Sequence, residues 1–233
     1  GGNYVADVSG SYSSGEFQDF KHRIEDLNSA DLVGKTVTLS FWASGGTTVG
    51  TAAHTVFLNY ANTSNNFSAT TNIASNSISL TNTATLFTFT FTNLPVGASN
   101  GLEIVFRSAQ SGGTGTITFS ISSVQLEIGS TATPFEYIDA ATQQSRCQRY
   151  FITSPFYVTR YANAAGTWGF GSVFFKTTMR TLSPTIVLSS IVYTACGSAF
   201  TSQVCKDSFL ISAVTSGLTD ATVSGAYTAE SEL

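Results

Sequence analysis

Apolar and polar residues alternate along much of this chain, as they do in strands that bury one face of a sheet. The clearest runs are KTVTLSFWAS, TVFLNYA, LFTFTFTNL and GLEIVFRSA. The positions expected to face a core are Val37, Leu39, Phe41 and Ala43, then Val56, Leu58 and Tyr60, then Phe87, Phe89 and Phe91, then Leu102, Ile104 and Phe106. Each of these runs is predicted to be a strand with one buried face.

A further run, TITFSISSVQLEI, changes parity in its middle. Its expected inward positions are first Ile117, Phe119 and Ile121, and then Val124, Leu126 and Ile128. One extra residue in a strand shifts the alternation in this way. The sequence therefore predicts a β-bulge at Ser122 and Ser123.

Clusters of Gly, Asn, Ser and Thr separate these strands and predict loops at residues 44–53, 61–72 and 108–116. Connections this short do not hold crossover helices, so the strands are expected to be antiparallel. Antiparallel amphipathic strands of this length and spacing are typical of two packed sheets closed as a jelly roll. We therefore expect an N-terminal jelly-roll β-sandwich over residues 1–138.

The alternation stops after Pro134 and resumes at Tyr150. Asp139 is a good N-cap for a short helix, so residues 139–149 are predicted to be a linker with such a helix. About five more alternating runs follow, in residues 150–162, 167–179, 183–195, 206–214 and 221–229. The predicted fold class is all-β, with residues 150–233 forming a second, smaller antiparallel β-domain.

The composition argues against two functions, nucleic-acid binding and membrane insertion. Only 10% of the residues are charged and the net charge is -4, so we expect no binding to nucleic acid, which attracts basic surfaces. No apolar run reaches the roughly 18 to 20 residues of a membrane span, so no membrane insertion is expected. Because the chain opens with Gly1 and Gly2 and has no initiator Met, we expect a processed chain or a piece of a longer one.

The candidate chemistry is sparse. Asp26, Asp31, Glu103, Glu127 and Glu136 are carboxylates, but nothing in their spacing pairs two of them across a cleft, as glycoside hydrolysis requires. The sequence also contains no nucleophile motif and no phosphate-binding loop. We therefore expect no enzyme activity.

The histidines and cysteines give no clear site. His22 is expected at an exposed strand edge or loop, and His54 is expected in solvent before a strand. Cys196 and Cys205 bracket eight residues and are a candidate disulfide, with free, inert thiols as the alternative; Cys147 has no partner. No metal site is indicated by the spacing of Cys and His.

Exposed aromatic residues are the candidates for binding. Sugars stack on aromatic rings and hydrogen-bond to the polar groups around them. Trp42 lies on the face opposite the core positions, and Tyr157 and Trp168 hold similar places in the second domain. These three residues are candidate glycan contacts; the alternative is that they pack in the core, under a covering segment or against a partner subunit.

Four stretches carry a resemblance: HRIEDLNSADLVGKTVTLSFWAS, NGLEIVFRS, ISSVQLEIGSTATPFEY and SRCQRYF. Together, over about residues 20–151, they resemble the carbohydrate-binding-like jelly roll of tail-fibre and other virion structural proteins of tailed bacteriophages. Downstream, VFFKTTMRTLSPTIVLS and VSGAYTAESEL are similar to the small β-domain that often follows it, with Met179, Arg180 and Pro184 at the matching positions.

The resemblance implies a non-enzymatic virion protein at the particle surface, either a tail fibre or a capsid decoration protein. It implies sibling subunits and other virion proteins as partners, a homo-oligomer such as a trimer, and host cell-surface glycans as a further partner. No cofactor is expected. Related secreted modules place a calcium-binding Asp where this chain has Ser122 and Ser123, which leaves structural calcium in doubt. The alternative function is a carbohydrate-binding module of a larger secreted enzyme.

Overall fold

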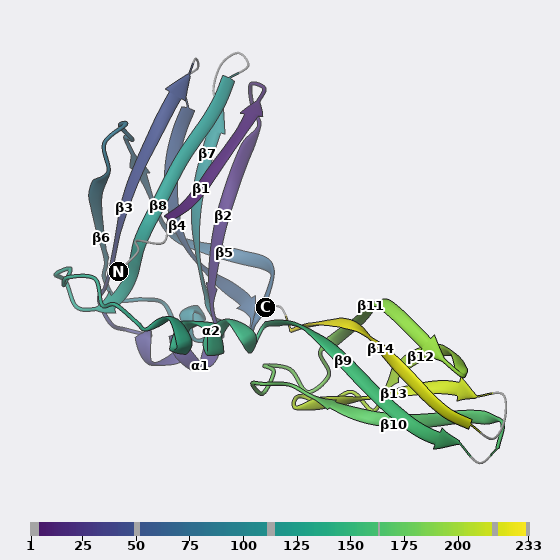
Figure 1. The fold of residues 1–233 in the computed structure, drawn as a ribbon. Coiled ribbons are helices and arrows are strands. Elements are labelled where there is room, and N and C mark those ends of the chain that lie inside the picture. Colours follow the sequence, from purple (N-terminus) through teal and green to yellow (C-terminus); the bar gives the residue numbers. More distant parts are fainter. Residues whose placement is uncertain (1–4, 49–51, 111–114, 163, 216–218, 232–233) are drawn as a thin grey trace. The chain divides into compact units, whose positions relative to one another are not determined.

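The fold is all-β, as the alternation predicts. The computed structural model describes residues 5–48, 52–110, 115–162, 164–215 and 219–231, and the chain divides into two compact units, residues 1–136 and 137–232 (Figure 1). The predicted loop residues 49–51 and 111–114 lie outside the described residues.

The first unit is a jelly roll made of two four-stranded antiparallel sheets. Sheet A has the strand order β1-β8-β3-β6 and sheet B the order β2-β7-β4-β5. Sheet A contains β1 (Val5–Tyr12), β8 (Gly115–Ile128), β3 (Val37–Thr48) and β6 (Thr85–Phe91). Sheet B contains β2 (Phe17–Ile24), β7 (Leu102–Gln110), β4 (Ala52–Thr63) and β5 (Asn66–Ile78). Short helical turns α1 (Asp26–Ser29), η1 (Ala30–Leu32) and η2 (Val96–Asn100) join the strands.

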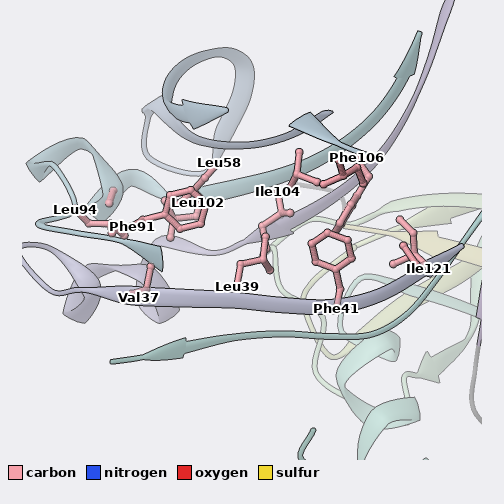
Figure 2. Packing of buried hydrophobic residues seen from close by; sticks show 14 of the residues in the cluster. Val37, Leu39, Phe41, Leu58, Phe91, Leu94, Leu102, Ile104, Phe106 and Ile121 are labelled. Carbon is pink, nitrogen blue, oxygen red and sulfur yellow. The ribbon is translucent and has the colours of Figure 1, made fainter. Parts of the chain in front are cut away.

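The core of the first unit lies between the two sheets (Figure 2). Phe41 of β3 meets Phe106 of β7 edge to face, with ring centroids 4.9 Å apart, so the two sheets interlock at this pair. The predicted inward residues of β3, β4 and β7 are buried, with Tyr60 partly so. Alternation therefore identified the core faces correctly, because successive side chains of a strand point to opposite sides.

The predicted bulge is confirmed in β8. Ser40 of β3 pairs with Gln125 and Trp42 pairs with Ser122, so β8 carries an extra residue in this interval. Ser123 has a positive φ of 53°, which gives the local turn of the backbone. Val124 and Leu126 pack against the core after the bulge, but Ile128 is 61% exposed, so its predicted inward position is wrong.

The second unit begins with the predicted helix, α2 (Ala140–Gln148), whose N-cap is Asp139. It continues as two three-stranded antiparallel sheets, sheet C in the order β11-β14-β9 and sheet D in the order β10-β13-β12. The strands are β9 (Phe151–Ala162), β10 (Gly166–Phe174), β11 (Thr185–Thr194), β12 (Cys196–Ser202), β13 (Ser208–Thr215) and β14 (Thr219–Glu230). Phe209 of β13 and Tyr227 of β14 meet edge to face in a separate core, with ring centroids 5.0 Å apart.

Two strands were not predicted. Residues 66–78, whose first part was predicted to be a loop, form β5 at the edge of sheet B, and Cys196–Ser202, which lie between two predicted runs, form β12. Both are rich in Ser, Thr, Asn or Gly, and hydrogen bonding to a neighbouring strand outweighs the turn propensity of these residues.

Candidate functional site

The outer face of sheet B carries a hollow of about 370 Å³. Alternate residues of β2, β7, β4 and β5 point away from the core there, and the antiparallel register places Lys21, Val105 and Phe57 side by side. The residues that line the hollow are Asp19, Lys21, Phe57, Asn59, Thr70, Asn72, Glu103, Val105 and Arg107. Strand pairing thus gathers residues that are far apart in the sequence.

Arg107 and Asp19 form a bidentate ion pair in the wall of the hollow. Arg107 Nε donates to Asp19 Oδ1 at 2.7 Å and its Nη2 donates to Asp19 Oδ2 at 2.8 Å. These hydrogen bonds raise the pKa of Arg107. The guanidinium also lies 4.0 Å from the ring centroid of Phe17 and 5.3 Å from that of Phe57. The planar group is therefore held between a carboxylate and two aromatic rings.

A second ion pair lies in the same sheet. Arg23 Nε donates to Glu103 at 3.1 Å, and the side chain of Glu103 is only 3% exposed. Glu103 lies on the outer face of sheet B, where Arg23 pairs with it and the residue is buried. A buried carboxylate needs such a partner because burial removes its hydration.

Amides line another side of the hollow. Asn72 Nδ2 donates to Asn59 Oδ1 at 2.9 Å and to the carbonyl oxygen of Ala74 at 3.0 Å, and Asn72 is exposed. Lys21 lies on β2, at the other edge of sheet B from Asn72, and its Nζ is 3.7 Å from Asp19 Oδ2. The lining holds two acidic and two basic residues, so its charges balance.

The predicted binding residue Trp42 lies on the other sheet. It occupies the outer face of sheet A, is 43% exposed, and pairs with Ser122 on one side and Leu86 on the other. Val5 pairs with Ser122 from the next strand, and Val5 and Leu86 are each 49% exposed. Trp42 is thus the centre of an apolar row across sheet A and takes no part in the hollow.

Tyr157 and Trp168 lie in the second unit, in different sheets. Tyr157 is 69% exposed on the outer face of sheet C. Trp168 is half-buried in sheet D; its indole nitrogen donates to the carbonyl oxygen of Ala164 at 3.1 Å, and the guanidinium of Arg160 lies 4.8 Å from its ring. Within the second unit, Tyr157 and Trp168 therefore lie on different sheets.

Two further predictions are corrected. His54 was expected in solvent but is buried, with Nδ1 2.7 Å from Ser108 Oγ, and burial lowers its pKa. Cys196 and Cys205 are both free. Cys196 opens β12 and Cys205 lies beyond its end, and a strand of seven residues extends about 23 Å, far beyond the reach of a disulfide. Of the two alternatives for this pair, free thiols rather than the candidate disulfide are present. His22 is exposed on the edge strand β2, as predicted.

Two of the other candidate carboxylates accept local hydrogen bonds. Glu127 accepts hydrogen bonds from the backbone and hydroxyl of Thr133, which lower its pKa. Asp26 accepts a hydrogen bond from Ser64. Within the described ranges, no three His, Cys, Asp or Glu residues are grouped as a metal site would require. In the same ranges, no helix has the length and apolar character to cross a membrane.

Sequence reasoning missed the hollow, although the chain holds a signal for it. In FQDFKHR and LEIVFR, charged residues alternate with apolar ones. Only 10% of the chain is charged, so two strands with this concentration of charge on their outward faces stand out. What the sequence does not show is that β2 and β7 are neighbours.

No protein-family model matches the chain, and neither does any curated protein. Among solved structures, one described as "CBM4 structure and function" is 24% identical, with 48% of this chain and 61% of that chain covered and a TM-score of 0.35. The tripod from the baseplate of bacteriophage Tuc2009 is 15% identical, with 57% and 49% covered and a TM-score of 0.41. The PBSX exported protein XepA is 11% identical, with 98% and 86% covered and a TM-score of 0.28.

The chain thus spans about half to three fifths of the length of the first two of these structures. With TM-scores below 0.5, these likenesses assign no family to the chain. The function is argued below from its own residues.

Proposed function

We propose that this chain is a non-enzymatic virion structural protein of a tailed bacteriophage, a tail fibre or a surface decoration protein, and that its jelly roll binds a neutral glycan in the hollow of sheet B. The observation that carries the binding role is the hollow itself, with an apolar floor and a polar, charge-balanced wall. The virion role is supported by the motifs from HRIEDL to SRCQRYF.

The chemistry of the hollow suits a sugar. The half-buried Phe57, beside the buried Val105, offers part of its ring to the carbon-bound face of a pyranose, and Asn59 and Asn72 offer donors and acceptors for its hydroxyls. Asp19 already has Arg107 as its partner, so the ligand does not need to bring a charge of its own. This is why we propose a neutral glycan rather than an acidic one.

The same geometry favours binding over turnover. General acid and base catalysis on a glycoside needs two carboxyl groups free to exchange protons with the substrate. Asp19 is held by Arg107 through two hydrogen bonds, and Glu103 is buried against Arg23. Both acids of the hollow are therefore committed to ion pairs.

Glycan binding is tested first on an array of neutral and acidic oligosaccharides. The chain is then titrated with the oligosaccharides that bind, by calorimetry. We expect Asn59→Ala combined with Asn72→Ala to weaken binding about tenfold or more, since at least two hydrogen bonds are lost. Trp42→Ala, an exposed aromatic on the other sheet, is the matched control and should bind as the wild type does. Loss of binding with Trp42→Ala alone would move the site to sheet A, and failure to bind any glycan would refute the binding role.

The virion role is tested on purified particles with an antibody against the chain. Labelling of particles is expected, and band intensity relative to the major capsid protein separates a fibre from an abundant decoration. Absence from particles, together with glycan binding, would favour the alternative function, a binding module of a larger secreted enzyme.

A further inference from the structure

The outer face of sheet C is open to solvent and carries large apolar and aromatic side chains among Ser and Thr. Five large side chains on this face are 49–69% exposed: Phe151, Tyr157 and Tyr161 of β9, and Val187 and Val192 of β11. We propose that this face is a self-association surface and that it packs against the same face of a second copy of the chain. This inference goes beyond the proposed function and does not depend on the glycan hollow.

The face has the relief of two ridges and a trough. β14 runs between β9 and β11, as Figure 1 shows. In one row across the sheet, Tyr157 and Val192 flank Ser224, and in another Val187 flanks Thr228. At Ser224 the central strand thus carries a small side chain between two large ones. A large side chain of a second copy, turned by a twofold axis, fits over Ser224.

The middle of this face carries no charge. In the described part of sheet C, the outward positions between the ends of β14 are Thr222, Ser224, Ala226 and Thr228, and charge occurs only at Asp220 and Glu230 near its two ends. In a contact between two copies these acidic residues meet at the rim, where water and salt screen their repulsion. The centre of a protein interface is typically poor in charge and rich in aromatic residues.

The edges of sheet C do not favour association by strand addition. β9 is an edge strand and carries Pro155, which has no N–H to donate. β11, at the other edge, has a register shift between Ser189 and Val192, with Ser190 at a φ of 51°. Proline and bulges at sheet edges hinder pairing with another strand. A second copy is thus directed to the face.

The outer face of sheet C is large enough for a specific interface between two copies. β9 and β14 each have 12 residues, and three strands of about that length cover about 40 Å by 14 Å, or about 550 Å². Two such faces bury about 1,100 Å² in total, which is above the roughly 1,000 Å² expected of a specific interface.

The test is sedimentation velocity of the full chain over a range of concentrations, with the Tyr157→Glu variant beside the wild type. The wild type should form a dimer, and Tyr157→Glu should raise the dissociation constant at least about 100-fold, because a twofold contact buries the new charge twice. Tyr157→Phe keeps the apolar contact and should remain dimeric. Phe200→Glu places the same charge on β12 in the other sheet, where Phe200 is 45% exposed, and should also remain dimeric.

Circular dichroism and thermal unfolding show whether each variant is folded. A wild type that is monomeric at every concentration, or a dimer that survives Tyr157→Glu, would overturn the inference. Dissociation by Phe200→Glu alone would place the contact on sheet D and would also overturn it. Glycan binding is also measured on Tyr157→Glu, which should bind glycan as the wild type does. This measurement shows whether loss of the dimer and loss of glycan binding occur separately.

Discussion

His54 is a buried titratable side chain whose protonation should affect folding. Burial lowers its pKa from the ordinary value of 6.5, so the unfolded chain binds the proton more tightly than the folded chain does. The contribution of His54 to stability is therefore complete above about pH 6.5 and declines as the pH falls below it toward the lowered folded-state pKa. We expect the wild type to lose stability from pH 7 to pH 5.

His54→Gln, which cannot take up that proton, should show a smaller loss than the wild type. Urea unfolding of the two proteins at a series of pH values measures it. Both proteins keep His22, so the difference between them isolates His54. Equal pH dependence in the two proteins would show that protonation of His54 is not linked to unfolding.

The three free thiols should differ in reactivity. Burial raises the pKa of Cys196, whereas hydrogen bonds from Ser208 lower the pKa of the exposed Cys205. Because the thiolate is the reactive form, iodoacetamide at neutral pH should label Cys205 well before Cys196. Peptide mass spectrometry over a time course measures the order. Recovery of a peptide pair linked through Cys196 and Cys205 would contradict the structure.

At the scale of the element, the bulge in β8 requires one residue, Ser123, to adopt a left-handed backbone conformation. Ser123 has a φ of 53°, a region that glycine occupies without strain and β-branched residues avoid. Ser123→Gly should change the free energy of unfolding little or raise it by up to about 1 kcal/mol, and Ser123→Val should lower it by about 1 to 2 kcal/mol.

The matched control is the neighbouring residue. Ser122 has an ordinary strand conformation, so Ser122→Gly should lower the free energy of unfolding by about 0.5 to 1 kcal/mol, opposite in sign to Ser123→Gly. Chemical denaturation of the three variants measures these differences. The same sign for both glycine variants would argue against the bulge at Ser123.

Individual strands were predictable where alternation was strong. The parity of Leu39 and Phe41, and the shift after Ser122, follow from the two-residue period and from nothing else. β5 and β12 were missed because their local composition favours turns and only their neighbours make them strands. The hollow was missed because Asp19 and Arg107 are 88 positions apart and meet only through the pairing of β2 with β7. Pairing partners are a tertiary property that a single strand does not encode.

At the scale of the whole molecule, each unit has a core of its own and should unfold on its own. Phe41 is fully buried in the first core and Phe209 in the second. Truncating either to Ala should cost its unit about 3 to 5 kcal/mol. Calorimetry should show two transitions, with Phe41→Ala lowering only one of them and Phe209→Ala only the other. A single transition that both substitutions lower equally would mean that the units unfold together.

The pairing of β1 with β8 sets how the first sandwich responds to mechanical force. The strands are antiparallel, and Val5 at the start of β1 lies opposite Ser122, near the end of β8. The chain therefore enters and leaves the sandwich at the same end. Tension applied between these two points does not slide the sheets past each other; it opens β1 from β8 one hydrogen bond at a time, like a zipper. Force applied between these two points therefore acts on the hydrogen bonds between β1 and β8 and not on the rest of the sandwich. A stretched assembly would carry its load through other contacts.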